Sequence, residues 1–309
     1  MLEESRGPKG NEDIWPELPY TAWKDTYATL HMWTQIVGKI ELELNPMTNH
    51  WWETALLVTP TGLTTYPIYY KNRCFTIDFN FQENLLKICT SDGSRKSMSL
   101  ESLSVSEFYF ELMKLLAELK ITVKINTLPQ EVPNPIPFQE NKANHTYSRQ
   151  HVKNFHKILL QADRLMKQFR GGFVGKASPV HFFWGSFDLA VTRFSGREAK
   201  SFEITDAVNK EAYSHEVISA GFWPGSRNIL EAAFYAYAAP EPKGFNTSHE
   251  ILPKEAFYNT TTKGYILKYE DVRKADYPDQ MVLDFFESTY EVGATLGGWD
   301  RRKLERNFH

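Results

Sequence analysis

The chain has 309 residues, enough for one large domain or two of ordinary size with a substantial buried core. Its formal net charge is only −3 and its 35 Lys and Arg residues are spread along the chain, which argues against a nucleic-acid partner or an anionic membrane surface. The N-terminal residues are charged and no run of about eighteen apolar residues occurs, so we expect a soluble, cytoplasmic protein without a secretory signal.

Three features of the composition bear on function. The chain contains 8 Trp, 15 Tyr and 21 Phe, and such side chains mostly fill cores, with ligand-stacking walls as the rarer use. Its two cysteines, Cys74 and Cys89, lie in strand-like segments, where we expect reduced thiols. No GxGxxG, HExxH, CxxC or GxSxG motif occurs, which disfavours dinucleotide-binding, zinc-protease and α/β-hydrolase proteins.

The first half of the chain begins with an amphipathic helical pattern. Apolar residues recur at helical spacing from Trp23 to Val37 and the pattern ends at Gly38, so a helix is predicted there. A second helix is predicted over 104–119, because that segment opens with the Ser-x-x-Glu spacing of a capping box. Alternating apolar residues and turn signals predict strands over 39–44, 51–59, 74–81, 85–90 and 121–126.

A connector separates this half from the next. Residues 129–148 contain four prolines among polar residues, and proline removes backbone donors, so an extended linker is predicted. The pattern then restarts with a helix over 152–169 that ends at Gly171-Gly172. Strands are predicted over 180–194, 214–222, 233–238 and 264–269, followed by a last helix over 279–296.

Two matched stretches suggest that the halves share an origin. Val37-Gly38-Lys39 recurs as Val174-Gly175-Lys176, each at a predicted helix end, and NHWWETALLVTPTG corresponds to VHFFWGSFDLAVTRFSG. We therefore predict an α+β fold built as a tandem repeat of two similar halves, residues 14–128 and 149–300. Each half is expected to contain a mostly antiparallel sheet with flanking helices. The halves would pack about a pseudo-twofold axis, with a ligand cleft between them.

Several long segments also resemble a known family. They are WPELPYTAWKDTYATLHMWTQIVGK, SPVHFFWGSFDLAVTRFSGR, SHEV with GFWPG, FYAYAAPEP and LGGWD. Together they are similar to an uncharacterised, mainly bacterial family known as "domain of unknown function 5996", over about Trp15 to Asp300. The resemblance implies a single evolutionary unit that spans both halves, and it carries no activity or catalytic residue to this chain.

The ionisable residues of the 180–194 segment raise the question of a site. His181 and Arg193 share one face of a straight strand but lie roughly 40 Å apart, and Asp188 lies on the other face. Gly185 permits a bend that would change this arrangement. Antiparallel pairing with 214–222 would bring Arg193 near Glu216, or Asp188 near His215, while His181 would lie near Trp223.

We therefore expect a site in the second half. His181 and His215 are the candidate bases or ligands, and Glu216 and Asp188 are the carboxylates that would orient them. The candidate substrate-binding residues are an anchor for an anionic group, three stacking walls and a polar residue of the first helix, namely Arg193, Trp184, Trp223, Trp33 and His31.

We favour a protein that binds a small molecule in an aromatic-lined cleft. Its leading form is an enzyme that uses His and carboxylate side chains for acid–base chemistry. A non-catalytic binding or interaction protein is one alternative. A metal-dependent enzyme with His31, His181 and His215 as ligands is another. The substrate, the cofactor and the oligomeric state do not follow from the sequence.

Overall fold

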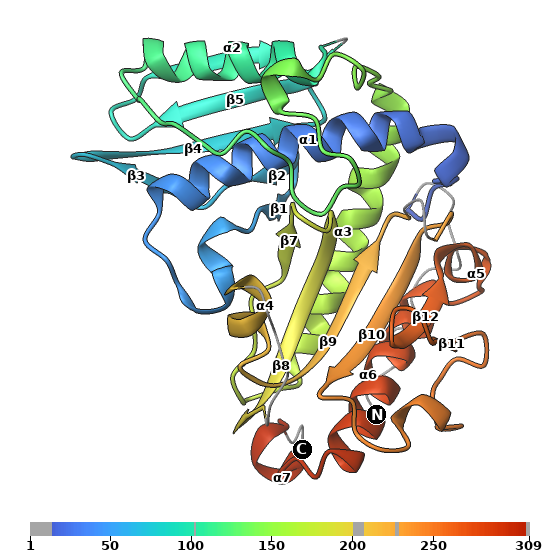
Figure 1. Ribbon diagram of the computed structural model, residues 1–309. Helices are drawn as coiled ribbons and strands as arrows, with labels where there is room; N and C mark the ends of the chain where they lie inside the picture. The colour runs from blue at the N-terminus through green and yellow to red at the C-terminus, as the bar shows by residue number, and fades with distance from the viewer. Residues whose placement is uncertain (1–13, 102, 200–206, 226–228, 307–309) are drawn as a thin grey trace, which may run out of the picture. The chain divides into compact units, whose positions relative to one another are not determined.

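The computed structural model describes residues 14–101, 103–199, 207–225 and 229–306 (Figure 1). The chain forms two compact units. Unit 1 contains the N-terminal segment through Pro19 together with Lys157–Val180 and Leu189–His309, and unit 2 contains Tyr20–His156 and His181–Asp188. Both units combine helices with an antiparallel sheet, which confirms the predicted α+β class. The predicted connector, residues 129–148, lies wholly within unit 2.

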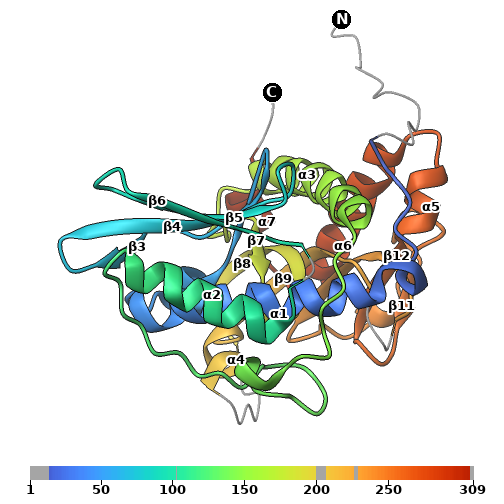
Figure 2. The same cartoon turned by 90° about the horizontal axis from the view of Figure 1, so that it is seen from above.

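Unit 2 is built on a six-stranded antiparallel sheet. Its strand order is β1 (Leu57–Thr59), β2 (Gly62–Thr64), β4 (Arg73–Asn80), β5 (Leu85–Thr90) and β6 (Arg95–Ser99), and β3 (Ile68–Tyr70) also pairs with β4. Helices α1 (Tyr20–Leu44) and α2 (Val105–Glu118) lie on one face of this sheet (Figure 2). The unit also holds η1 (Asn49–Thr54), η2 (Phe138–Glu140), β7 (His181–Phe183) and the start of α3 (Arg149–Gly171).

Alternation along β4 explains the core of unit 2. Phe75, Ile77 and Phe79 are fully buried on the helix-covered face, as period-two spacing predicts. Phe79 stacks on Phe108 of α2 at 6.2 Å between ring centroids, and Phe108 in turn stacks on Trp33 of α1 at 4.9 Å. The predicted capping box at the start of α2 is present, with the Ser104 side chain accepting from the Glu107 N–H.

Helix α1 continues beyond its predicted end. Gly38 lies inside the helix, where a Cβ atom would come within 2.0 Å of Trp184 Nε1. Glycine is required there because the Trp184 ring packs directly on the helix backbone, and it does not mark a helix end. The strand predicted over 39–44 is therefore wrong, and no strand forms over 121–126.

Unit 1 is built on a second antiparallel sheet, five of whose strands follow the order β11 (Phe257–Asn259), β12 (Gly264–Lys268), β10 (Ala233–Ala239), β9 (His215–Trp223) and β8 (Asp188–Glu198). Helices α3 and α6 (Pro278–Leu296) lie against one face of this sheet (Figure 1). Phe286 of α6 joins the layers, since its ring lies 5.6 Å from Phe169 of α3 and 5.8 Å from Phe234 of β10. Short elements complete the unit: α4 (Ala207–Ala212), η3 (Phe245–Thr247), α5 (Tyr269–Lys274) and α7 (Arg301–Leu304).

The segment predicted as one strand over 180–194 is interrupted. It forms β7 and β8 with a turn between them, and Phe187 in that turn has a left-handed φ of 59°. The bend that Gly185 was expected to permit is therefore present. The matched stretches differ as well, because Val37-Gly38-Lys39 lies within α1 whereas Val174-Gly175-Lys176 follows the end of α3.

None of the helices formed by the described residues combines the length and the apolar character needed to span a bilayer.

The turn after β7 is held by a histidine of α1, inside unit 2. His31 is 5% exposed, and its Nε2–H donates to the Gly185 carbonyl at 2.8 Å. Burial lowers the pKa of His31 to about 4, although hydrogen bonds to the Gly185 and Trp184 backbone oppose that shift. His31 is therefore neutral in the folded protein at neutral pH.

We expect His31 to make folding sensitive to mild acid. An unfolded histidine takes up a proton near its ordinary pKa, but folded His31 resists protonation until about pH 4, so stability falls as pH decreases between these values. Relative to His31→Gln, the wild-type free energy of unfolding should fall by roughly 2 kcal/mol between pH 7 and pH 5. Urea denaturation at both pH values measures this difference, and parallel pH profiles for the two proteins would contradict it.

Candidate functional site

Unit 1 contains a pocket at one end of its sheet. Its cavity volume is about 100 Å³, and its walls come from three stretches of chain: the start of β9, the end of β10 with the residues that follow it, and the C-terminal end of α6. These stretches coincide with SHEV, FYAYAAPEP and LGGWD. The lining residues are Glu216, Val217, Ile218, Ala238, Ala239, Pro240, Glu241, Pro242, Gly293, Gly297 and Trp299.

Glu216 is held in this pocket by Arg197. The Nη2 and Nε atoms of Arg197 donate to Glu216 Oε2 at 2.6 and 2.9 Å. The same guanidinium donates to the carbonyl oxygens of Gly297 at 2.6 Å and Gly298 at 3.1 Å, just beyond α6. A planar group with five donors suits this arrangement, and a positive charge is favoured at the negative end of a helix dipole.

A strand irregularity allows Arg197 to reach these partners. The register of β8 against β9 shifts between Phe194 and Glu198, and Gly196 has a φ of 86° that favours glycine. A shift of this kind redirects the side chains that follow it. Arg197 therefore turns toward Glu216 and the end of α6.

The second carboxylate of the pocket has a different environment. Glu241 Oε2 accepts a short hydrogen bond from the Tyr258 hydroxyl of β11. Burial, the hydrogen bond and the charge of Glu241 raise the pKa of Tyr258 to about 12, so Tyr258 is a neutral donor at neutral pH. Across the described ranges no Lys, Arg or His forms an ion pair with Glu241, in contrast to Glu216.

Arg193 occupies a different place from the one predicted. It lies opposite Ile218 in the β8–β9 ladder and is only 1% exposed, so the expected pair of Arg193 with Glu216 is wrong. Its guanidinium carbon lies 3.4 Å from the Phe169 ring centroid and 4.2 Å from that of Tyr290. Its Nη1 donates to Glu287 Oε2 at 3.2 Å, so its charge is balanced inside unit 1.

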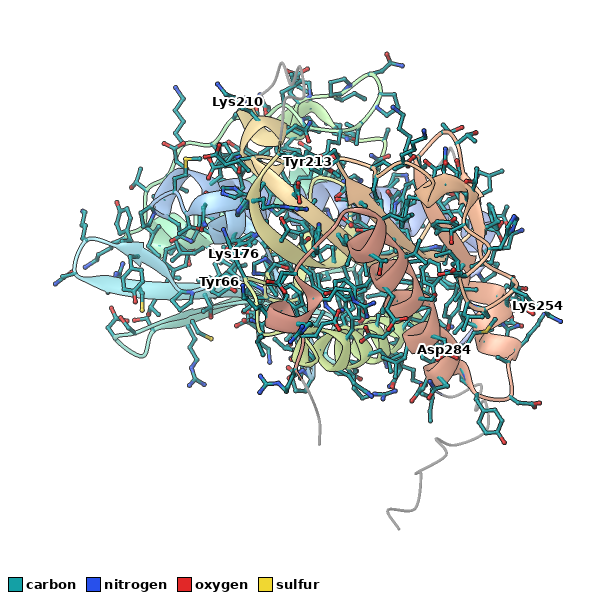
Figure 3. The ribbon with its side chains drawn as sticks, turned by 90° about the horizontal axis from the view of Figure 1, so that it is seen from below. Tyr66, Lys176, Lys210, Tyr213, Lys254 and Asp284 are labelled. Carbon is teal, nitrogen blue, oxygen red and sulfur yellow. The ribbon has the colours of Figure 1, made fainter. Side chains whose placement is uncertain are left out.

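The two neighbours Glu216 and His215 point to opposite faces of β9, as strand alternation requires. Glu216 lines the pocket, whereas His215 Nδ1 lies 3.0 Å from Ser214 Oγ at the strand start. Trp223 shares the His215 face and is half-buried. Tyr213, labelled in Figure 3 at the end of α4, shares a 3.1 Å hydroxyl hydrogen bond with Tyr237 of β10.

His181 lies in unit 2, on β7, and is fully buried. Its Nε2 shares a 3.0 Å hydrogen bond with the hydroxyl of Tyr66, a half-buried residue labelled in Figure 3. Glu41 of α1 accepts the Tyr66 backbone N–H at 3.0 Å through Oε1, while its buried Oε2 has no hydrogen-bond partner among the described residues. Burial raises the pKa of Glu41 well above its usual range.

The remaining candidates also lie in unit 2. Trp184 is buried and donates through Nε1 to the Thr54 carbonyl at 2.8 Å, and Trp33 is enclosed by Phe108 and Tyr147. Asp188 is 8% exposed and accepts a short hydrogen bond from Ser186. Among the residues that the structure describes, no three His, Cys, Asp or Glu side chains are grouped to hold a metal ion.

Sequence reasoning identified Glu216 but missed Arg197, Glu241, Tyr258 and Trp299. Glu241 and Trp299 belong to the segments that carry the family resemblance, so the only available signal was their presence there. Their convergence depends on sheet register and on loops, which residue spacing does not report.

Comparison with known proteins adds one assignment. The model of a family of unknown function (DUF5996) matches residues 15–306, nearly the whole chain. No curated protein and no solved structure matches the sequence. The chain therefore belongs to this family, as the resemblance in its motif segments indicated.

Proposed function

We propose that unit 1 binds a small organic molecule in the pocket lined by Glu216, Glu241 and Trp299. The observation that carries the proposal is the convergence of three distant segments on one cavity that holds two carboxylates in different environments. Concave sites with apolar walls and a few polar groups are the usual form of small-molecule sites.

The size of the pocket limits what can enter it. A cavity of about 150 Å³ holds benzene, so a volume of about 100 Å³ accepts a group of only a few non-hydrogen atoms. Val217, Ile218 and Pro240 supply apolar contact for the ligand, and the carboxylates orient it by accepting hydrogen bonds.

This proposal predicts binding that depends on Glu241. In ligand-observed NMR with a fragment library of anionic, neutral and cationic compounds, some fragments should bind the wild type and lose at least about tenfold in affinity in Glu241→Ala. Glu255→Ala is the matched control, since Glu255 is exposed and does not line the pocket. If no fragment separates these two variants, the pocket is not a ligand site.

A second candidate function is acid–base catalysis in unit 2, favoured by the hydrogen bond between His181 and Tyr66. A base within 3.0 Å of a half-buried hydroxyl has the reach needed for proton transfer, and Glu41 holds the Tyr66 backbone by accepting its N–H. This candidate retains His181 as the base that the sequence suggested.

Any proton-transfer activity found for the protein should therefore fall by about 100-fold or more in His181→Gln. Tyr66→Phe should reduce the rate as well, while circular dichroism reports a retained fold in both. The exposed Tyr69→Phe substitution is the control. A rate that is unchanged in His181→Gln would eliminate this candidate.

We also propose a cytoplasmic location and a duplication of two similar halves about a pseudo-twofold axis. The location is supported by composition, and the duplication by the matched stretches around His50 and His181. Cell fractionation tests the first, and recovery of the protein with membranes or outside the cell would oppose it. A family alignment tests the second, and the absence of any similarity between the halves would oppose it.

A further inference from the structure

The pocket of unit 1 contains two carboxylates, and a positive charge of the protein balances only one of them. Arg197 donates twice to Glu216, so this pair contributes no net charge. Glu241 is bonded to the neutral Tyr258 hydroxyl, and nowhere in the described part of the chain is it ion-paired. The polar wall therefore has a net charge of about −1, which favours a ligand group with a single positive charge.

A second observation comes from Trp299. This residue is 9% exposed, lines the pocket, and packs its ring 6.1 Å from Tyr290. The indole N–H of a tryptophan is a hydrogen-bond donor only. A ligand in the pocket can therefore pair with this side chain only through an acceptor atom of its own.

The apolar part of the pocket adds a third requirement. Val217, Ile218, Pro240 and Pro242 exclude water from part of the cavity without offering a side-chain hydrogen bond. A bare metal ion would leave these walls unused, since hard cations take several oxygen ligands. An organic cation with short carbon segments would contact both the carboxylates and these walls.

Resting on the proposed function of the pocket, we infer that its ligand is a singly charged organic ammonium that also carries an oxygen acceptor, and that Arg197 sets the preference for a single charge. The ammonium would donate to Glu241, and the oxygen would accept from Trp299. The structure gives Arg197 this role because it cancels Glu216 from within the protein, so the ligand does not have to.

Three probes separate these requirements. Ethanolamine has one ammonium and one hydroxyl, ethylamine lacks the oxygen, and 1,3-diaminopropane carries two positive charges at neutral pH. Titration calorimetry with the full-length wild type should give the highest affinity for ethanolamine. The diamine should bind about tenfold more weakly, because a second ammonium would face no free carboxylate.

Substitutions at Arg197 isolate its charge. Arg197→Gln exposes a second uncompensated carboxylate and should shift the ratio of diamine to ethanolamine affinity by about tenfold toward the diamine. Arg197→Lys keeps the positive charge and should keep the wild-type ratio even where it loosens the fold. Arg302→Gln, at an exposed arginine of α7, is the matched control and should change neither ratio.

Trp299→Phe tests the acceptor. Without an indole N–H, the preference of the pocket for ethanolamine over ethylamine should disappear. An unchanged ratio of diamine to ethanolamine affinity in Arg197→Gln would overturn the role of Arg197, and an unchanged preference for ethanolamine in Trp299→Phe would overturn the acceptor.

The fragment library distinguishes failure of this inference from failure of the pocket proposal. If fragments of another charge class bind in a Glu241-dependent way while the ammonium probes do not, the ligand class is wrong but the pocket proposal stands. If no compound binds in a Glu241-dependent way, both proposals fail.

Discussion

The guanidinium of Arg197 joins β8 to two of the three stretches that line the candidate pocket, the start of β9 and the end of α6. Through four hydrogen bonds it links β8 to Glu216 of β9 and to two carbonyl oxygens that follow α6. A lysine would bring a point charge without the planar fork, so it would not hold both partners in this geometry. The register shift at Gly196 is what aims this side chain, and in this way a local irregularity of one strand determines the wall of a site formed by distant segments.

Arg193 shows the opposite use of the same residue type on the same strand. It lies before the register shift, enters the core between the rings of Phe169 and Tyr290, and is balanced by Glu287. Fully buried charges of this kind are tolerated only when they are paired. Arg193 therefore acts as a packing residue of unit 1, whereas Arg197, half-exposed, remains available to shape a surface pocket.

Sequence periodicity was sufficient where one face of an element is buried and the other is solvated. The helices α2, α3 and α6 and the strands β4, β5, β9, β10 and β12 were all predicted close to their observed bounds. The end of α1 was not, because Gly38 has the appearance of a helix terminator and residues 39–44 alternate like a strand. The packing of the Trp184 ring on the helix backbone explains why residue 38 is a glycine. The hydrogen bond from the Tyr66 backbone N–H explains why Glu41 is buried, although the neighbouring Leu42 is partly exposed.

The candidate site was less predictable as well, because its residues are brought together by tertiary contacts that the spacing of residues does not report. Glu216 could be selected from its sequence alone, but its partner could not, because the choice between Arg193 and Arg197 depends on a register shift that leaves no periodic signal. Glu241, Tyr258 and Trp299 come from a loop, an edge strand and a helix end, and their proximity is a tertiary property.

The most direct test of this account is the indole N–H signal of Trp299 in a ¹H–¹⁵N correlation spectrum during a titration with ethanolamine. We predict a saturable shift of the Trp299 signal, assigned through Trp299→Phe, while the signal of Trp223 on the opposite face of the sheet stays in place. A titration that leaves Trp299 unchanged, or that moves the Trp223 signal alone, would contradict the assignment of the pocket as the ligand site.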